Sequence, residues 1–457
     1  MRAALTLLAR VLLSAVLVMA ALAAPAASTP AAGWRDRIGI AGAAAPAVTT
    51  RSPLLALIDT PVDAGNAAFS GGSLSADAAL VPYDLHGTAT AAVAAATGAG
   101  GLLGVWPGMR VRSFPFAQDR ASCEAIARLV TRAVAQGAAT ISMSFGSDAP
   151  CFAEQAALQA ATRRGVVLVA AAGNDRLGGN PIEYPAADPH VITVSALGQG
   201  DAPAAFSSTS SGPDVTAPGT DVLTAVPWAF DPDPITDGIA QLSGTSFSAP
   251  MVAAAATWLR AARPALTSGQ IGMLLCDAAR DIGAPGWDRR TGCGVLDVRA
   301  ALLHRAPSPD PGEPNDDVQW VDGLDTGAPS PSIWRGARDA VLRAWVTARE
   351  DPADVYRIQR PPHSTTRITL TPTAGGADLR VLEPTALDIA DRSALLAVSR
   401  ARGRGTDQVT VTNPAARWRV AYVVVTHDPR AGLHRSRYTL SVRSPARPGR
   451  RARSRPR

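Results

Sequence analysis

Short apolar runs rich in β-branched residues alternate with longer, alanine-rich runs between Leu54 and about Arg305. Strands that alternate with helices form a parallel sheet covered by helices on both faces. We therefore expect residues 51–305 to form a three-layer α/β/α domain around a mostly parallel, doubly wound sheet. The predicted strands are Leu54–Ile58, Arg110–Phe114, Thr140–Met143, Val166–Ala170, Val191–Ala196 and Val215–Ala217. The predicted helices are Thr88–Ala96, Glu124–Gln136, Ala153–Arg163, Ser246–Ala262 and Ser268–Ala279.

The 457 residues are enough for a second domain, and the sequence changes character at Ala306. Turn-forming residues there predict a linker over residues 306–325. The strand-like runs that follow are punctuated by glycine and proline, which predicts a small all-β sandwich over residues 326–443. Its expected strands are Val355–Ile358, Thr366–Leu370, Leu379–Leu382, Gln408–Val411, Trp418–Val425 and Tyr438–Val442. We expect the arginine-rich residues 444–457 to be a solvated, disordered tail.

The amino terminus has the order of a secretory signal peptide. Arg2 and Arg10 precede an apolar core, Val11–Ala24, and small residues end the core and follow it. The core is shorter than the ~20 residues of a membrane-spanning helix, so we expect cleavage rather than anchoring. We assign residues 1–27 to the signal peptide and residues 28–50 to a linker. Since no later segment is apolar enough to span a bilayer, we predict a secreted protein, extracellular or periplasmic.

A net charge of +6 raises the question of a nucleic-acid partner. All the basic residues are arginine, and alanine, glycine and proline are abundant, which indicates a GC-rich codon bias. The excess of positively charged residues is also concentrated near the carboxyl terminus. We therefore expect no nucleic-acid partner.

Four cysteines fit an exported protein. They allow three pairings, of which we favour Cys123 with Cys151 and Cys276 with Cys293, because each bond would close one local loop. A zinc site is not expected, because the chain has no CxxC motif or Cys/His cluster.

Four polar residues stand where apolar runs end or helices begin. Asp59 follows the first strand and Asn174 follows a later one, while His86 and Ser246 open alanine-rich helices. Each alone is an ordinary cap or turn residue. Together they could form a site, because open α/β sheets place their sites at the carboxyl ends of strands and a helix amino terminus stabilises an oxyanion.

In this order, Asp59, His86, Asn174 and Ser246 resemble the motifs of the subtilisin-like (subtilase) serine proteases. The resemblance covers roughly residues 54–305, and its most specific part is the segment Gly244-Thr245-Ser246 through Pro250. Other matching segments are Ile141–Gly146, Tyr184–Ala187, Val191–Val194 and Val215–Gly219.

The resemblance implies a role for each site residue. Ser246 would be the nucleophile, His86 the general base and then acid, and Asp59 the group that orients and stabilises the imidazolium. The Asn174 side chain and the Ser246 backbone N–H would form the oxyanion hole. The substrate would contact Ser144, Phe145 and Gly146 at the cleft edge, and Ala171, Ala172 and Gly173 in the pocket.

The chain departs from the family pattern beside two of these residues. Pro61 replaces the usual glycine after Asp-Thr, and Ala89 and Thr90 replace His-Val after His-Gly-Thr. Phe247 and Met251 are also unusual, but no departure removes a group that the chemistry needs. Residues Phe116–Arg120 occupy the stretch of the family's glycine-rich edge segment. No cofactor is needed for catalysis, and the family resemblance leaves structural calcium open.

The carboxyl-terminal region more loosely resembles the pre-peptidase C-terminal domains found beside secreted proteases. The matching segments are Glu313–Asp316, Asp354–Ile358 and Tyr438–Val442. Glu313, Asp316 and Asp317 could hold a cation, but we favour a solvated, turn-rich linker.

The expected function is that of a secreted, monomeric serine endopeptidase acting on proteins or peptides through an acyl-enzyme. Two alternatives stay open: a catalytically inactive scaffold with this fold, and a dedicated processing protease with one partner. The altered surroundings of Asp59 and His86, and a segment too short for a folded propeptide, support the scaffold.

Overall fold

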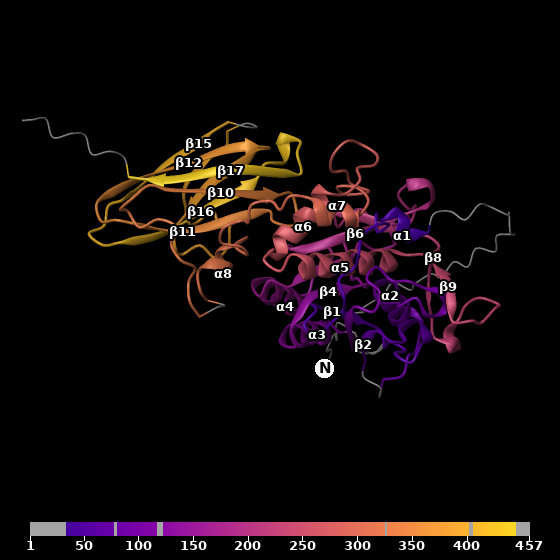
Figure 1. The fold of residues 1–457 in the computed structure, drawn as a ribbon. Coiled ribbons are helices and arrows are strands. Elements are labelled where there is room, and N and C mark those ends of the chain that lie inside the picture. Colours follow the sequence, from indigo (N-terminus) through magenta and orange to yellow (C-terminus); the bar gives the residue numbers. More distant parts are fainter. Residues whose placement is uncertain (1–32, 77–79, 117–121, 325–326, 402–404, 445–457) are drawn as a thin grey trace, which may run out of the picture. The chain divides into compact units, whose positions relative to one another are not determined.

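The computed structural model describes residues 33–76, 80–116, 122–324, 327–401 and 405–444 (Figure 1). The predicted signal peptide and most of the predicted tail lie outside these ranges. Contacts divide the chain into two compact units, Met1–Ser308 and Pro309–Arg457. Within the described ranges, no helix combines the length and the apolar character needed to cross a bilayer.

The first unit contains a seven-stranded sheet with the order β2-β3-β1-β4-β5-β6-β7, and all its neighbouring strands are parallel. Its strands are β1 (Leu54–Asp59), β2 (Ser73–Ser75), β3 (Arg110–Pro115), β4 (Ala138–Met143), β5 (Val167–Ala171), β6 (Val191–Leu197) and β7 (Val215–Pro218). All six predicted strands are present. The edge strand β2 was not predicted, because it is short, exposed and has no apolar run.

Both faces of this sheet are buried. In β1, Leu55 and Leu57 belong to one apolar core, and Ala56 and Ile58 belong to another, since successive side chains of a strand point to opposite faces. The first core includes residues of α2 (His86–Ala95), α5 (Thr245–Ala262), α6 (Ser268–Asp277) and α7 (Val298–Leu303), and the second includes α3 (Cys123–Ala135) and α4 (Phe152–Arg163) (Figure 1). The predicted three-layer α/β/α architecture is confirmed.

The strand order reverses direction at β1, which creates a crevice at the carboxyl ends of the central strands. After β1 the chain adds strands on the β3 side, and after β3 it returns to add β4 on the other side of β1. Ligands of open α/β sheets bind outside the carboxyl ends of the strands at such a reversal. The carboxyl ends of β1, β4 and β5 are adjacent here, because β1 pairs with β4 and β4 pairs with β5.

The segment predicted as a linker over residues 28–50 is partly structured. It contains the short helix α1 (Trp34–Arg37), and the Ile38 side chain is fully buried in the first core. The Ile38 carbonyl accepts a hydrogen bond from the Val298 backbone N–H at 2.9 Å. The linker prediction is corrected at these residues, because the two isoleucines at positions 38 and 40 supply enough apolar surface to dock the segment. The hairpin of β8 (Val222–Ala225) and β9 (Ile239–Leu242) was also not predicted.

The second unit contains two four-stranded antiparallel sheets, with the orders β10-β17-β12-β15 and β11-β16-β13-β14. Their strands are β10 (Ala340–Thr347), β11 (Ala353–Arg360), β12 (Ser364–Ala374), β13 (Ala377–Leu382), β14 (Leu395–Ser399), β15 (Asp407–Asn413), β16 (Arg419–His427) and β17 (Arg435–Arg443). Residues of both sheets share one core, which includes Ile358, Ile368 and Val423. This arrangement is the predicted β-sandwich. The edge strands β10 and β14 were not predicted, although both carry apolar residues. The first half of β10 and all of β14 are exposed or only partly buried.

Residues 313–321 also differ from the predicted linker. The helix α8 (Val318–Val321) contributes Val318 and Val321 to a small core with Val355 and Val424. The Val355 backbone N–H donates to the Asn315 carbonyl at 2.8 Å. This segment therefore belongs to the sandwich, because its valines cover apolar side chains that would otherwise be exposed.

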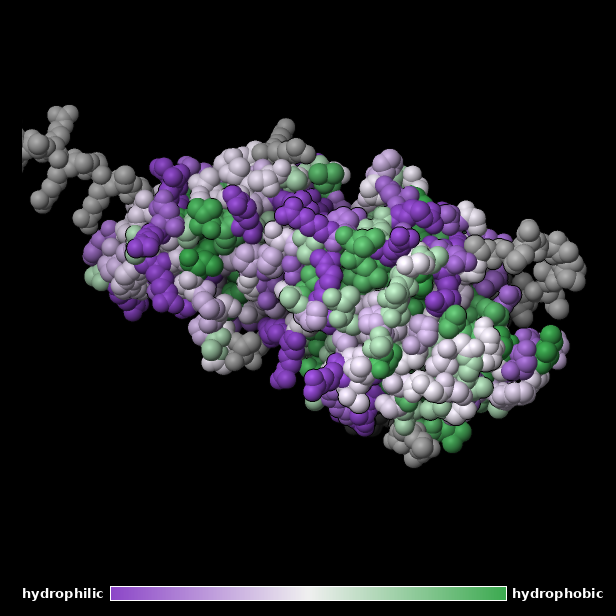
Figure 2. Space-filling model, in the orientation of Figure 1, coloured by the Kyte–Doolittle hydropathy of each residue, from purple (hydrophilic) through white to green (hydrophobic). Residues whose placement is uncertain are grey.

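The four cysteines form the two favoured disulfides. Cys123, at the start of α3, is bonded to Cys151, which caps α4, and Cys276 in α6 is bonded to Cys293. Both bonds close local loops of the first unit. On the face of the molecule drawn in Figure 2, hydrophilic residues are spread among apolar ones.

Candidate active site

The last residue of β1 and the first residue of α2 form the centre of the candidate site. The His86 Nδ1 atom lies 2.6 Å from the Asp59 Oδ1 atom. The Asp59 side chain is only 1% exposed and the His86 side chain 12% exposed. Because Nδ1 is held by Asp59, Nε2 is left as the ring nitrogen for exchanging protons with another group.

Two further donors fix the Asp59 carboxylate. The Thr60 backbone N–H donates to Oδ1 at 2.7 Å, and the Thr90 hydroxyl donates to Oδ2 at 2.9 Å. Sequence reasoning treated Thr90 only as a departure from the family's valine. Its position in α2, one turn after His86, was the signal that could have indicated this contact.

Hydrogen bonds around Thr60 hold the start of α2 beside the end of β1. The Asp84 Oδ1 atom accepts hydrogen bonds from the His86 backbone N–H at 2.9 Å and from the Thr60 hydroxyl at 2.6 Å. The Gly87 backbone N–H donates to the Thr60 hydroxyl oxygen at 2.8 Å. A Cβ at Gly87 would lie 2.1 Å from the Thr60 carbonyl oxygen, so only glycine permits this close approach.

Burial and charge act on His86 in opposite directions. Burial alone would lower the pKa of the imidazole, but the charge and hydrogen bond of Asp59, with a further contribution from Asp84, raise the pKa above the ordinary value of 6.5. Asp59 and Asp84 therefore favour the imidazolium form.

Ser246 lies in the first turn of α5 and lines the same pocket as His86. Its hydroxyl donates to the Ser144 carbonyl at 3.3 Å, while the Ser144 hydroxyl donates to the Ser246 carbonyl at 2.8 Å. In the described part of the chain, no hydrogen bond joins Ser246 to His86. Catalytic hydrogen bonds are often long in ligand-free enzymes and shorten when substrate binds.

Asn174 follows β5 and is oriented by its neighbour in the pocket wall. Its Oδ1 atom accepts from the Thr245 backbone N–H at 2.9 Å and from the Thr245 hydroxyl at 3.0 Å. Because these contacts occupy the carbonyl end of the amide, the Nδ2 donor is the end left for a ligand in the pocket.

The pocket contains most of the residues predicted to bind substrate. Ser144, Phe145 and Gly146 line it from the end of β4, and Ala171 and Gly173 line it from the end of β5. Ala172 does not line it. Ala172 is fully buried, and its backbone N–H donates to the Val194 carbonyl, which extends the pairing of β5 with β6. Because successive side chains of an extended segment point to opposite sides, the Ala172 side chain points away from the side on which Ala171 and Gly173 line the pocket. Sequence reasoning did not predict six other lining residues: Thr60, Asp84, Phe116, Asp175, Glu183 and Thr245.

Comparison with known proteins identifies the family of the first unit. The sequence profile of the subtilase family, Peptidase S8, matches residues 50–294. The chain belongs to the subtilase family. It is thus a serine-type endopeptidase of the subtilisin type.

Individual relatives are similar over part of the chain. Subtilisin BL of Lederbergia lenta is 32% identical over 219 residues, which are 47% of this chain and 77% of that protein. The halolysin-like extracellular serine protease Nep of Natrialba magadii is 36% identical over 167 residues, which are 36% of this chain and 29% of that protein. The solved structure of the self-cleaved protease domain of PatA is 30% identical, with a TM-score of 0.47, over 55% of this chain and 95% of that one.

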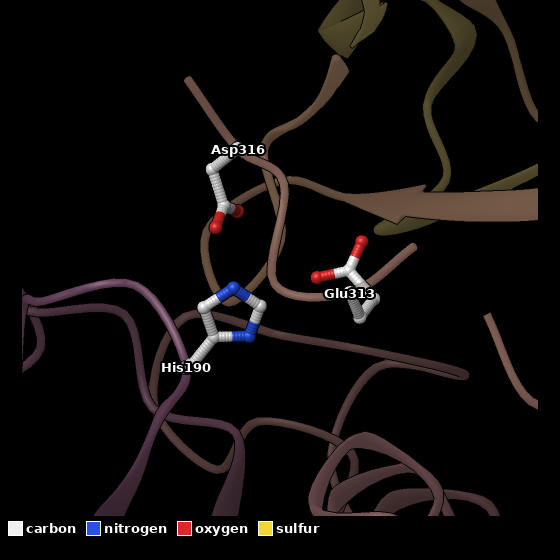
Figure 3. Close-up of side chains that lie close together, drawn as sticks. All are labelled: His190, Glu313 and Asp316. Atoms are coloured by element: carbon white, nitrogen blue, oxygen red, sulfur yellow. The ribbon is translucent and has the colours of Figure 1, made fainter. Parts of the chain in front are cut away.

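The second unit of this subtilase contains a buried group of carboxylates. One oxygen each of Asp310, Glu313 and Asp351 lie within 4.8 Å of one another. Glu313 and Asp316 come from the same segment, which leads into the sandwich (Figure 3). Burial first, and then the neighbouring carboxylates, raise the pKa of Asp310 to about 9 and the pKa of Asp351 well above its ordinary value.

The Thr90 contact can be tested by Thr90→Val, which keeps the shape of the side chain and removes the donor to Asp59. Leaving a buried carboxylate oxygen without this donor costs about 1.4 kcal/mol, so kcat should fall about tenfold while KM stays the same. Steady-state kinetics on a peptide substrate would measure both constants.

Thr88→Val is the matched control. Thr88 is also buried in α2, but its hydroxyl accepts from the Asp63 backbone N–H and does not touch Asp59. Equal losses of kcat in the two variants would show that Thr90 acts through helix stability alone.

Proposed function

We propose that this subtilase is a secreted endopeptidase that cleaves proteins through an acyl-enzyme on Ser246. The observation that carries the proposal is the buried Asp59–His86 contact of 2.6 Å in the pocket that Ser246 also lines. A hydroxyl, an imidazole and a carboxylate in this order are what nucleophilic catalysis at a peptide carbonyl needs.

In the acylation step, Ser246 Oγ would attack the scissile carbonyl carbon while His86 Nε2 takes the hydroxyl proton. The Asp59 carboxylate stabilises the imidazolium that forms. His86 would then give that proton to the leaving amine, so that the C–N bond breaks and the acyl group stays on Ser246. Deacylation repeats the sequence with water as the attacking group.

The oxyanion of each tetrahedral intermediate would lie at the amino terminus of α5. The Asn174 Nδ2 group and the Ser246 backbone N–H are the donors available there, and the helix dipole favours negative charge. Loss of one such donor typically costs about 10²–10³ in rate. The fixed orientation of Asn174 by Thr245 supports this role, because a preorganised donor does not have to be turned during the reaction.

Secretion is supported by the signal-like order of residues 1–27 and by two disulfides, which persist in oxidising compartments. One similar protein is described as extracellular.

The catalytic proposal is tested with a fluorophosphonate probe, which reacts with activated serines, on the purified protein and on Ser246→Ala. We expect labelling of the unsubstituted protein and none of the variant, together with casein hydrolysis that Ser246→Ala abolishes. Absence of Ser246-dependent labelling in the folded, mature protein contradicts the proposal and favours the inactive scaffold. Labelling without casein hydrolysis favours a dedicated processing protease.

We also propose that the carboxylate group of the second unit holds a calcium ion. Asp351 is 1% exposed, and neither of its carboxylate oxygens has a hydrogen-bond partner among the described residues. The Asn315 amide donates through Nδ2 to Asp354 and Val355, which leaves its carbonyl oxygen as a further candidate ligand. Several carboxylates with an amide oxygen are the hard donors that calcium prefers. The sequence favoured a solvated linker at Glu313, and we now propose that this residue contributes to a cation site instead.

Calcium binding would change how stability depends on pH. Since the folded pKa values of these carboxyls exceed the unfolded ones, the metal-free sandwich should lose stability as pH rises above the unfolded values. Calcium replaces the protons, so at pH 8 it should raise the free energy of unfolding by about 3 kcal/mol at 100 times its Kd, relative to EDTA. Thermal unfolding of the full chain would measure this.

Asp351→Asn should abolish the calcium effect and stabilise the EDTA-treated protein at pH 8. Asp407→Asn, at a buried carboxylate of the same sandwich outside the group, should leave the calcium effect intact. If calcium stabilises Asp351→Asn as much as the unsubstituted protein, the site is not where we place it.

A further inference from the structure

One acidic residue that the proposed mechanism does not use lies in the candidate active-site pocket. Glu183 belongs to the connection between β5 and β6 and lines the pocket together with Ser246 and His86. Its backbone is well anchored: the Ser211 hydroxyl donates to the Glu183 carbonyl, and the Glu183 N–H donates to the Ser211 hydroxyl oxygen at 2.8 Å. The next residue, Tyr184, pairs with Ser147 through two backbone hydrogen bonds. The position of the side chain is therefore set by the fold.

The Glu183 side chain reaches between the two segments that form the pocket walls. A Cβ added to Gly146 would lie 2.5 Å from the Glu183 Oε2 atom, and one added to Gly173 would lie 2.7 Å from its Cγ atom. Gly146 follows β4, at the expected cleft edge, and Gly173 follows β5, in the pocket expected to hold the side chain before the scissile bond. The space left by two missing side chains is thus filled by a carboxyl group.

The two charges that act on Glu183, those of Asp175 and Asp148, are both negative. The residue is 3% exposed, and in the described part of the chain no side chain donates a hydrogen bond to its carboxyl group or forms an ion pair with it. Burial, and then the charges of Asp175 and Asp148, raise the pKa of Glu183 to about 7. Asp175 and Asp84 also line the pocket. A cation is the ligand that would satisfy a buried carboxylate among other carboxylates.

We propose that Glu183 makes this subtilase selective for peptide bonds that follow arginine or lysine. The residue before the scissile bond would place its apolar stem beside Ala171 and the two glycines and its charged end against the Glu183 carboxylate. Long cationic side chains suit such a pocket, because their methylene groups pack on apolar walls while the charged group reaches a polar partner. The inference rests on the proposed function of the pocket as a protease subsite.

The test uses fluorogenic peptides that differ only in the residue before the scissile bond: arginine, lysine, phenylalanine, leucine or alanine. We expect the highest kcat/KM for arginine and lysine. Glu183→Gln, which keeps the shape and removes the charge, should lower kcat/KM for the arginine substrate about 100-fold and should not lower it for the phenylalanine substrate, so that the ratio of arginine to phenylalanine cleavage falls at least 100-fold. A preference for phenylalanine or leucine in the unsubstituted enzyme would overturn the proposal, and would mean that Glu183 binds neutral side chains in its protonated form.

Glu154→Gln is the matched control. Glu154 is a buried glutamate in the first turn of α4, and burial, followed by Asp188, raises its pKa to about 7 as well, but it does not line the pocket. Its substitution should leave the ratio of arginine to phenylalanine cleavage unchanged. In the unsubstituted enzyme that ratio should rise as pH increases through about 7, because the charged form of Glu183 binds the cation, whereas titration of His86 cancels in the ratio.

Benzamidine binding separates this inference from the proposed function, because it needs no turnover. Calorimetry should show that this aromatic cation binds to Ser246→Ala and that the double variant Ser246→Ala/Glu183→Gln has lost at least tenfold in affinity. If the protease test fails and benzamidine still binds through Glu183, only the catalytic proposal is wrong. If Ser246 hydrolyses peptides and neither the substrate preference nor benzamidine binding depends on Glu183, only the cationic specificity is wrong.

Discussion

The contact between Asp59 and His86 is the interaction on which the proposed chemistry of this protein depends. It joins the end of a buried strand to the start of a buried helix, and it brings a carboxylate and an imidazole together where little water reaches them. Burial alone would lower the pKa of His86, and the charge of Asp59 reverses that effect. The hydrogen bonds from Thr60 and Thr90 hold the carboxylate in place, so that His86 keeps one ring nitrogen for the reacting groups.

The sheet order explains why this contact lies beside a usable pocket. The carboxyl ends of β1, β4 and β5 are adjacent beside the strand reversal. Asp59 is the last residue of β1, and the residues after β4 and β5 supply the Ser144–Gly146 wall and Asn174. The helix that starts at Thr245 then brings Ser246 to the same place. Glu183 enters the pocket from the connection between β5 and β6, which also carries Asn174.

The sequence alone predicted most of the sheet, because buried parallel strands carry continuous apolar runs. It also singled out Asp59 at the end of a strand and His86 and Ser246 at the starts of helices, and the structure places all three around one pocket. The sequence did not predict β2, which is short and has no apolar run, or β14, whose apolar residues are exposed or only partly buried. Thr90 and Glu183 were missed for another reason. Their contacts join residues that are not neighbours in the chain. The helical spacing of Thr90 from His86 is only an indirect signal of its contact with Asp59, and nothing in the sequence indicates that two glycines leave room for a glutamate.

The protonation of His86 tests the central claim most directly. The chain has six histidines, so the ring nitrogens of ¹⁵N-labelled Ser246→Ala protein can be followed by NMR during a pH titration, with a His86 variant for assignment. We expect the pKa of His86 to lie above 6.5 and the additional substitution Asp59→Asn to lower it, because burial then acts without the opposing charge. A His86 that titrates at or below 6.5, or that is unaffected by Asp59→Asn, would contradict the account.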